Sequence, residues 1–110
     1  MKNAVFLGDS LDNIREFPDP AKQDVGYQLD KVQHGQMPDD FKHMPSIGTG
    51  VVEIRTKDEH GIYRVIYTAK FADNVYILHA FTKKTQKTAR ADIMLAKDRL
   101  KQLIAHLAKE

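Results

Sequence analysis

The chain has 110 residues, of which 42% are hydrophobic and 29% charged, and it contains no Cys. This composition and length predict a single folded domain spanning residues 1–110 rather than a disordered chain. The absence of Cys excludes disulfide bonds and any metal site built on thiolates. No apolar run approaches the roughly 20 residues that span a membrane, so we expect a cytoplasmic protein with no membrane partner.

The charge of the chain is small in total but unevenly distributed. The formal net charge is +2. Residues 1–50 hold five Lys and Arg against eight Asp and Glu, whereas residues 51–110 hold twelve against seven, which gives net charges of −3 and +5. A basic second half indicates a polyanionic partner, although an ordinary solvated surface can have the same composition.

A short apolar stretch and a short helix are predicted at the start of the chain. Residues 4–7 are apolar and are followed by Gly8, which is typical of an edge strand. Leu11, Ile14 and Phe17 then recur at helical spacing. Pro18 ends this first helix, because Pro cannot donate the next helical hydrogen bond.

A longer helix and a loop follow. Asp19 is the expected N-cap of this helix, and Pro20 suits its first helical position. Gly35 is the expected C-terminal stop. Residues 36–50 contain two Pro and two Gly and show no sustained period, so we expect a loop there.

Three strands and a final helix are predicted in the second half. VVEIRT (51–56), IYRVIY (62–67) and VYILHAF (75–81) are rich in β-branched and aromatic residues, and short turns separate them. They predict an antiparallel meander whose third strand, apolar on both faces, lies inside the sheet. A helix capped by Thr88 is expected to run to about Ala108. The order β-α-α-β-β-β-α predicts an α+β domain, in which an N-terminal helical hairpin and a C-terminal helix pack on an antiparallel sheet.

Two arginines lie within the predicted strands. Arg55 alternates away from the apolar positions of its strand, and Arg64 lies in the middle of the next one. If these strands pair around the intervening turn, the two arginines lie close together and Glu53 can pair with both. The face that carries them is either an ordinary solvated surface or an anion pocket, because Arg binds phosphate bidentately and stays charged.

Further cations gather between the last strand and the last helix. The segment FTKKTQKTAR (81–90) contains Lys83, Lys84, Lys87 and Arg90 and no acid. Cations beside a helix N-terminus oppose the helix dipole, and such a local conflict often indicates a functional site. A bound phosphate would relieve the repulsion. The alternative is a solvated basic loop.

The other polar candidates are weaker. His79 lies in an apolar strand, where a hydrogen-bonded core residue is the simpler interpretation. The remaining His residues show no metal-ligand spacing, and Asp39 and Asp40 fall in a predicted turn. We therefore expect neither a metal nor another cofactor, and the sequence contains no Gly-rich phosphate loop or nucleophile elbow.

The motifs of the second half, GVVEIRT, GIYRVIY and YILHAFTKKTQKTARADIMLAKDRL, cover roughly residues 50–100. Together they resemble the HigB-like, phage-derived branch of the RelE/ParE toxin superfamily, and the predicted order of elements is similar to that superfamily's fold. The Lys-Lys-Thr-Gln-Lys-Thr run is the most specific part of the resemblance. Two positions depart from the usual pattern, since Ala89 replaces Pro and Ile54 replaces Leu.

The resemblance implies the toxin of a type II toxin–antitoxin system. Such a toxin is a metal-independent endoribonuclease, or mRNA interferase, that usually cuts mRNA on the ribosome. A small helix-turn-helix antitoxin inhibits it in a hetero-oligomer. ParE-like members instead inhibit DNA gyrase, and a non-catalytic RNA-binding domain is a third possibility, so both alternatives stay open.

The resemblance also implies functional residues by position. The expected catalytic residues are Arg55, Arg64, Lys83 and Lys84. We further expect RNA contacts from Lys57, His79, Lys87 and Arg90. Cleavage by attack of the RNA's own 2′-OH needs cations around the transition state, which the arginines supply, and proton transfer, for which Lys83 or Lys84 is the first candidate and His79 the second.

Overall fold

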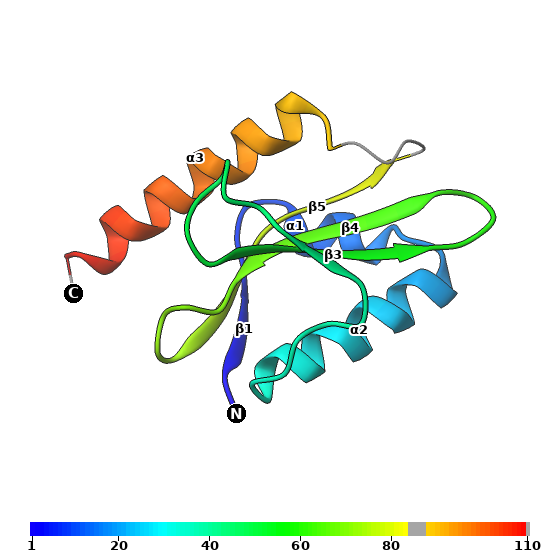
Figure 1. The fold of residues 1–110 in the computed structure, drawn as a ribbon, viewed down its shortest axis with the longest axis horizontal. Coiled ribbons are helices and arrows are strands. Elements are labelled where there is room, and N and C mark those ends of the chain that lie inside the picture. Colours follow the sequence, from blue (N-terminus) through cyan, green and yellow to red (C-terminus); the bar gives the residue numbers. More distant parts are fainter. Residues whose placement is uncertain (84–87, 110) are drawn as a thin grey trace.

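The computed structural model describes residues 1–83 and 88–109 and confirms an α+β fold. The described elements, in chain order (Figure 1), are β1 (Asn3–Phe6), α1 (Ser10–Arg15), α2 (Asp19–Gln33), β2 (Phe41–His43), β3 (Val51–Lys57), β4 (Ile62–Thr68), β5 (Asn74–Lys83) and α3 (Arg90–Leu107). Lys84 and Lys87, both expected to be functional, lie outside the described residues. Within residues 1–83 and 88–109, no helix has the length and hydropathy needed to cross a membrane.

The described strands form one mixed sheet in the order β1-β5-β4-β3-β2. β3, β4 and β5 are antiparallel neighbours, which confirms the predicted meander, and β5 lies inside the sheet. β1 pairs with β5 in parallel, so the expectation of a wholly antiparallel sheet is wrong at this edge. A parallel neighbour requires a long crossover connection, and the chain from α1 to β4 supplies it.

The region predicted as a loop, residues 36–50, contains a short edge strand. β2 pairs antiparallel with β3, with Phe41 opposite Ile54 and His43 opposite Val52. The loop prediction is therefore wrong for the three residues of β2. A strand this short shows no measurable alternation, and the nearby Pro and Gly residues outweigh it in the sequence.

The helices cover both faces of the sheet (Figure 1). α1 and α2 pack on one face, where Val25 belongs to the same apolar cluster as Ile54. α3 packs on the other face, where Leu100 clusters with Ile66 and Leu78. Burial on both faces explains why β5 is apolar on both sides, as predicted.

The ends of the two long helices differ slightly from the prediction. The N-cap of α2 is Pro18 rather than Asp19, which is the first helical residue. Gly35 follows the helix with φ of +84°, a conformation that favours Gly, which confirms the predicted stop. α3 has Ala89 as its N-cap, so the prediction that Thr88 caps this helix is wrong. The hydroxyl of Thr88 is instead part of a buried polar network.

A β-bulge in β5 changes the direction of its side chains. The register pairs Ile66 with His79 but Tyr67 with Ile77, so Leu78 is an extra residue with no partner in β4. A bulge lets two consecutive side chains turn to the same side of a sheet. Leu78 belongs to the cluster beneath α3, and His79 contacts α3 as well. The bulge therefore directs His79 toward α3.

Candidate functional site

The sheet brings together most of the residues that were expected to be functional. The register places them in two neighbouring rows across β3, β4 and β5, with Arg55, Arg64 and Phe81 in one row and Lys57, Ile62 and Lys83 in the next. Directly opposed residues of antiparallel strands share a face, and this is the face on which α3 packs. Arg55, Lys57, Arg64 and Lys83 are therefore neighbours on one surface of the sheet.

A buried carboxylate connects the two arginines. Glu53 Oε1 accepts hydrogen bonds from Arg64 Nη1 at 3.0 Å and from Arg55 Nε at 3.1 Å. Its other oxygen, Oε2, accepts a hydrogen bond from the Thr88 hydroxyl at 2.7 Å, and that hydroxyl accepts one from Arg64 Nη1 at 2.7 Å. The predicted pairing of Glu53 with both arginines is confirmed, and Thr88 joins the network from the segment before α3.

The two arginines differ in exposure. The side chains of Arg64 and Glu53 have no exposed surface, whereas the Arg55 side chain is 24% exposed. A buried charge needs a partner, and for Arg64 the carboxylate of Glu53 supplies it. Of the two guanidinium groups, that of Arg55 is the one that a ligand can reach.

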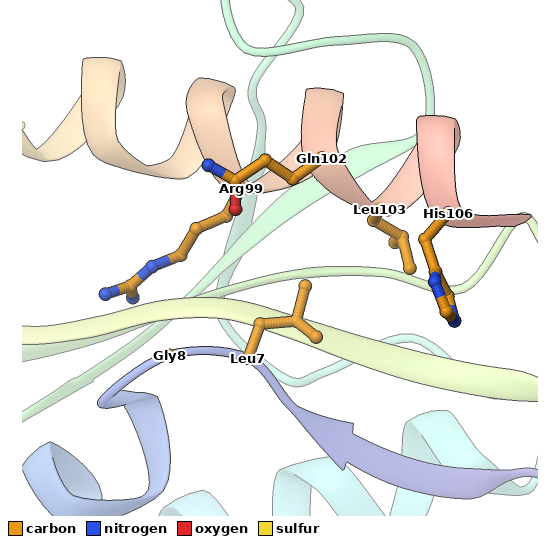
Figure 2. Close-up of a pocket in the computed structure, with 6 residues that line it drawn as sticks. All are labelled: Leu7, Gly8, Arg99, Gln102, Leu103 and His106. Atoms are coloured by element: carbon orange, nitrogen blue, oxygen red, sulfur yellow. The ribbon is translucent and has the colours of Figure 1, made fainter.

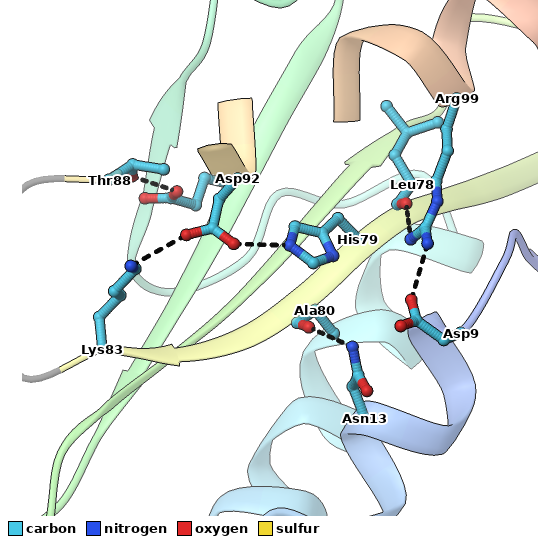
Figure 3. A network of polar contacts seen from close by, with 10 residues as sticks. Asp9, Asn13, Leu78, His79, Ala80, Lys83, Thr88, Asp92 and Arg99 are labelled. Atoms are coloured by element: carbon cyan, nitrogen blue, oxygen red, sulfur yellow. Dashed lines mark hydrogen bonds and ion pairs between the residues drawn. The ribbon is translucent and has the colours of Figure 1, made fainter. Parts of the chain in front are cut away.

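A second carboxylate holds the lysine at the end of β5 (Figure 3). Asp92, in the first turn of α3, lies 3.0 Å from Lys83 Nζ through Oδ2 and 2.8 Å from His79 Nε2 through Oδ1. The Lys83 side chain is 26% exposed, and its ammonium lies 5.8 Å from the centre of the Phe81 ring. Asp92 therefore fixes Lys83 at the edge of the site while part of the lysine stays accessible.

His79 is a core residue in this structure. It is 4% exposed, and its ring stacks on Phe81 with centroids 4.9 Å apart. A carboxylate can only accept hydrogen bonds, so the contact with Asp92 requires a proton on Nε2. Among the described residues Nδ1 has no hydrogen-bond partner. The ring can act on Lys83 through Asp92, but it does not reach the open surface.

The other expected RNA-binding residues lie around this centre. Lys57 is exposed at the end of β3, and Arg90 is exposed at the start of α3. The described part of the site thus has accessible cations at its edge and carboxylates beneath them. Such an arrangement orients positive groups toward an anion without leaving buried charges unpaired.

Two members of the site, Thr88 and Asp92, were not predicted from the sequence. Thr88 has the residue type of a helix cap, and an acid in the first helical turn is explained by the helix dipole. Both local explanations suffice without a distant partner. Their position directly after the basic run is the signal that could have indicated a role in the site. Polar and acidic side chains there can pair with the cations of the neighbouring strands.

A cavity of about 260 Å³ lies between α3 and the residues that directly follow β1 (Figure 2). Arg99 dominates it, but its guanidinium already donates to Asp9 at 2.7 Å and to the Leu78 carbonyl at 2.9 Å. The hydrogen bond from Arg99 holds the pKa of Asp9 below its usual value. Any side chain in place of Gly8 would collide with the guanidinium, because its Cβ would lie only 2.5 Å from Arg99 Cζ. These contacts give Arg99 a structural role in joining α3 to β5 and to Asp9 at the start of α1.

A metal centre finds no support in the described residues, which contain no group of three or more His, Asp or Glu side chains close enough to hold an ion. The expected independence from metal stays a prediction about the reaction.

The family comparison covers most of the chain. The family described as "Phage derived protein Gp49-like (DUF891)" matches residues 12–101. This range contains both carboxylate-centred networks, from Glu53 to Asp92. A search of curated proteins finds no match. The chain therefore belongs to the Gp49-like phage-derived protein family, a family of RelE/HigB-like toxins.

Proposed function

We propose that this chain is the toxin of a type II toxin–antitoxin system and that it cuts mRNA on the ribosome as a metal-independent endoribonuclease. Membership of the Gp49-like family supports the toxin part. The observation that carries the ribonuclease part is the pair of partly exposed cations, Arg55 and Lys83, each held by a buried or half-buried carboxylate. Preorganised cations of this kind stabilise the charge of a phosphoryl transition state.

The proposed reaction is attack of a ribose 2′-OH on the adjacent phosphate. The O2′–P bond forms and the P–O5′ bond breaks, while the 2′-OH releases its proton to solvent water. The products are a 2′,3′-cyclic phosphate and, once O5′ is protonated, a 5′-OH. Arg55 contacts the phosphate with its terminal guanidinium nitrogens, because its Nε is bound to Glu53. Lys83 lies in the neighbouring row and donates a proton to the leaving oxygen.

Four residues act behind these two. Arg64 is buried, so we assign it a positioning role through Glu53 in place of a direct phosphate contact. Glu53 and Thr88 orient Arg55, and Asp92 orients Lys83. Lys57 and Arg90 extend the positive surface for the flanking RNA, whereas the expected roles of Lys84 and Lys87 rest on the sequence alone. The proposed partners are mRNA, the ribosome and a helix-turn-helix antitoxin.

The test is brief induction in growing bacteria with mapping of new mRNA 5′ ends. We expect new ends inside translated frames, and Arg55→Ala or Lys83→Ala should remove them. The matched control is Arg15→Ala, because Arg15 lies on α1 with its side chain 67% exposed and outside this face. The chemistry of the ends gives a second readout, since 2′-OH attack leaves a cyclic phosphate and a 5′-OH.

Two results would contradict this proposal, the first its ribonuclease activity and the second its active site. Growth arrest with intact mRNA would indicate gyrase inhibition, which DNA supercoiling assays can then test. New ends that persist in both Arg55→Ala and Lys83→Ala would place the active site elsewhere on the chain.

A further inference from the structure

A groove of about 380 Å³ lies beside the middle and C-terminal part of α3, away from the first turn that carries Asp92. It runs between this helix and the loop that precedes β3. The groove is lined by Ile47, Gly48, Thr49, Lys70, Lys97, Leu100, Lys101 and Ile104. None of these residues belongs to the networks of Glu53 or Asp92, so the groove is a separate surface.

The floor of the groove is apolar and firmly packed. Ile47 and Leu100 are buried, and Ile104 adds an apolar side chain that is 45% exposed. The loop approaches the helix closely, because a Cβ on Gly48 would lie 2.5 Å from Leu100 Cδ2. An exposed Ile beside such a floor offers apolar surface to a partner.

The rim of the groove is uniformly basic. Lys70, Lys97 and Lys101 contribute three ammonium groups, and among the described residues the lining contains no carboxylate. Lys97 and Lys101 are four residues apart on α3, so their like charges face each other across one helical turn and repel. Carboxylates of a partner would relieve this repulsion.

The chemistry of the groove favours one class of partner. Nucleic-acid surfaces usually combine cations with aromatic side chains or Arg that stack on bases, and the described lining has neither. An apolar floor with a basic rim is instead complementary to a helix that has one apolar face and flanking acids.

We propose that this groove binds an acidic amphipathic helix of the antitoxin. The apolar face of that helix covers Leu100 and Ile104, and its carboxylates pair with Lys97 and Lys101. This inference rests on the toxin part of the proposed function and is independent of the ribonuclease step. It places the antitoxin on a surface distinct from the Arg55 and Lys83 site.

The first experiment reverses the charge of the rim. Lys97→Glu/Lys101→Glu is expressed with and without the cognate antitoxin, and its matched control is Lys22→Glu/Lys109→Glu. The control makes the same charge change outside the groove lining. We expect the groove variant to arrest growth even when the antitoxin is present, whereas wild type and control are neutralised. For the purified complex we expect Kd to rise at least tenfold and its salt dependence to weaken.

The second experiment tests the apolar floor. Ile104→Asp is compared with Met94→Asp, because both residues lie on α3 with 45% exposure and only Ile104 lines the groove. We expect Ile104→Asp to weaken antitoxin binding at least tenfold and Met94→Asp to bind like wild type. Equal effects of the two variants would overturn the proposal.

The remaining outcomes separate this inference from the proposed function. Neutralisation of the Lys97→Glu/Lys101→Glu variant at the wild-type level would overturn the groove as the docking site. Loss of growth arrest by this variant in the absence of antitoxin, with a native circular dichroism spectrum, would also overturn it. Such a result would indicate that the two lysines contact the cellular target of the toxin. A wild-type chain that does not arrest growth would contradict the toxin function, and the measured Kd of the purified complex would still decide the role of the groove.

Discussion

The two faces of the sheet bury different kinds of side chain. Toward α1 and α2 the core is built from apolar side chains such as Val25, Ile54 and Val65. Toward α3 the core is apolar only in part, and Glu53 and Arg64 are buried beside it as ions. A buried ion pair contributes little net stability compared with apolar packing. One face therefore stabilises the fold, while the other holds charged groups in the fixed geometry that the proposed reaction needs.

The largest expected effect comes from breaking the ionic face. Glu53→Ala leaves the buried Arg64 without this carboxylate, and we expect the free energy of unfolding to fall by about 3–5 kcal/mol. Urea denaturation measures the change, and Glu16→Ala, at an exposed position, is the control. A Glu53→Ala protein as stable as wild type would show that Arg64 does not depend on this ion pair.

The adjacent residue tests the apolar face. Ile54 is fully buried and points to the α2 side, so Ile54→Ala creates a cavity, and we expect a loss of about 2–5 kcal/mol. Substitutions on the two faces should also differ in their effect on RNA cleavage. Assayed well below its melting temperature, Ile54→Ala should cleave RNA at the wild-type rate. A large loss of kcat in this folded variant would mean that the faces are not functionally distinct.

A smaller effect is expected at Thr88, where the ionic face meets α3. Thr88→Val keeps the shape of the side chain but removes the hydroxyl that bridges Arg64 and Glu53, and we expect a loss of about 1–3 kcal/mol. If Thr88 positions Arg55 through Glu53, kcat should fall roughly 10- to 100-fold with little change in KM. Thr88→Ser restores the hydroxyl and should recover most of the rate. A Ser variant as slow as the Val variant would exclude the hydroxyl as the cause.

The sequence predicted those parts of the site that depend on local pattern and strand pairing. Arg55 and Arg64 flank a short turn, so the register of their strands was almost determined, and with it the position of Glu53. The bulge at Leu78 leaves no clear trace in an apolar strand, because any of several residues can be the extra one. The hydrogen bond from Thr88 to Glu53 joins residues 35 positions apart. Contacts at such a distance depend on how α3 packs, and a single sequence does not contain that information.

The smallest effect belongs to the apolar face and appears only at high pH. Burial raises the pKa of Tyr67 to about 12, from the ordinary value of 10.0. The neutral phenol is therefore favoured in the folded state, so this contribution to stability is complete below pH 10 and is lost as the pH rises through 12.

Tyr67→Phe cannot ionise and lacks this loss. We expect the difference in unfolding free energy between wild type and Tyr67→Phe to be constant from about pH 7 to 9 and to shift in favour of the variant above about pH 10. The lysines titrate in both proteins and cancel in the difference. A constant difference up to about pH 12 would mean that the phenol ionises equally easily in the folded and unfolded chains. Water would then reach the Tyr67 hydroxyl despite the burial of this residue in the apolar face.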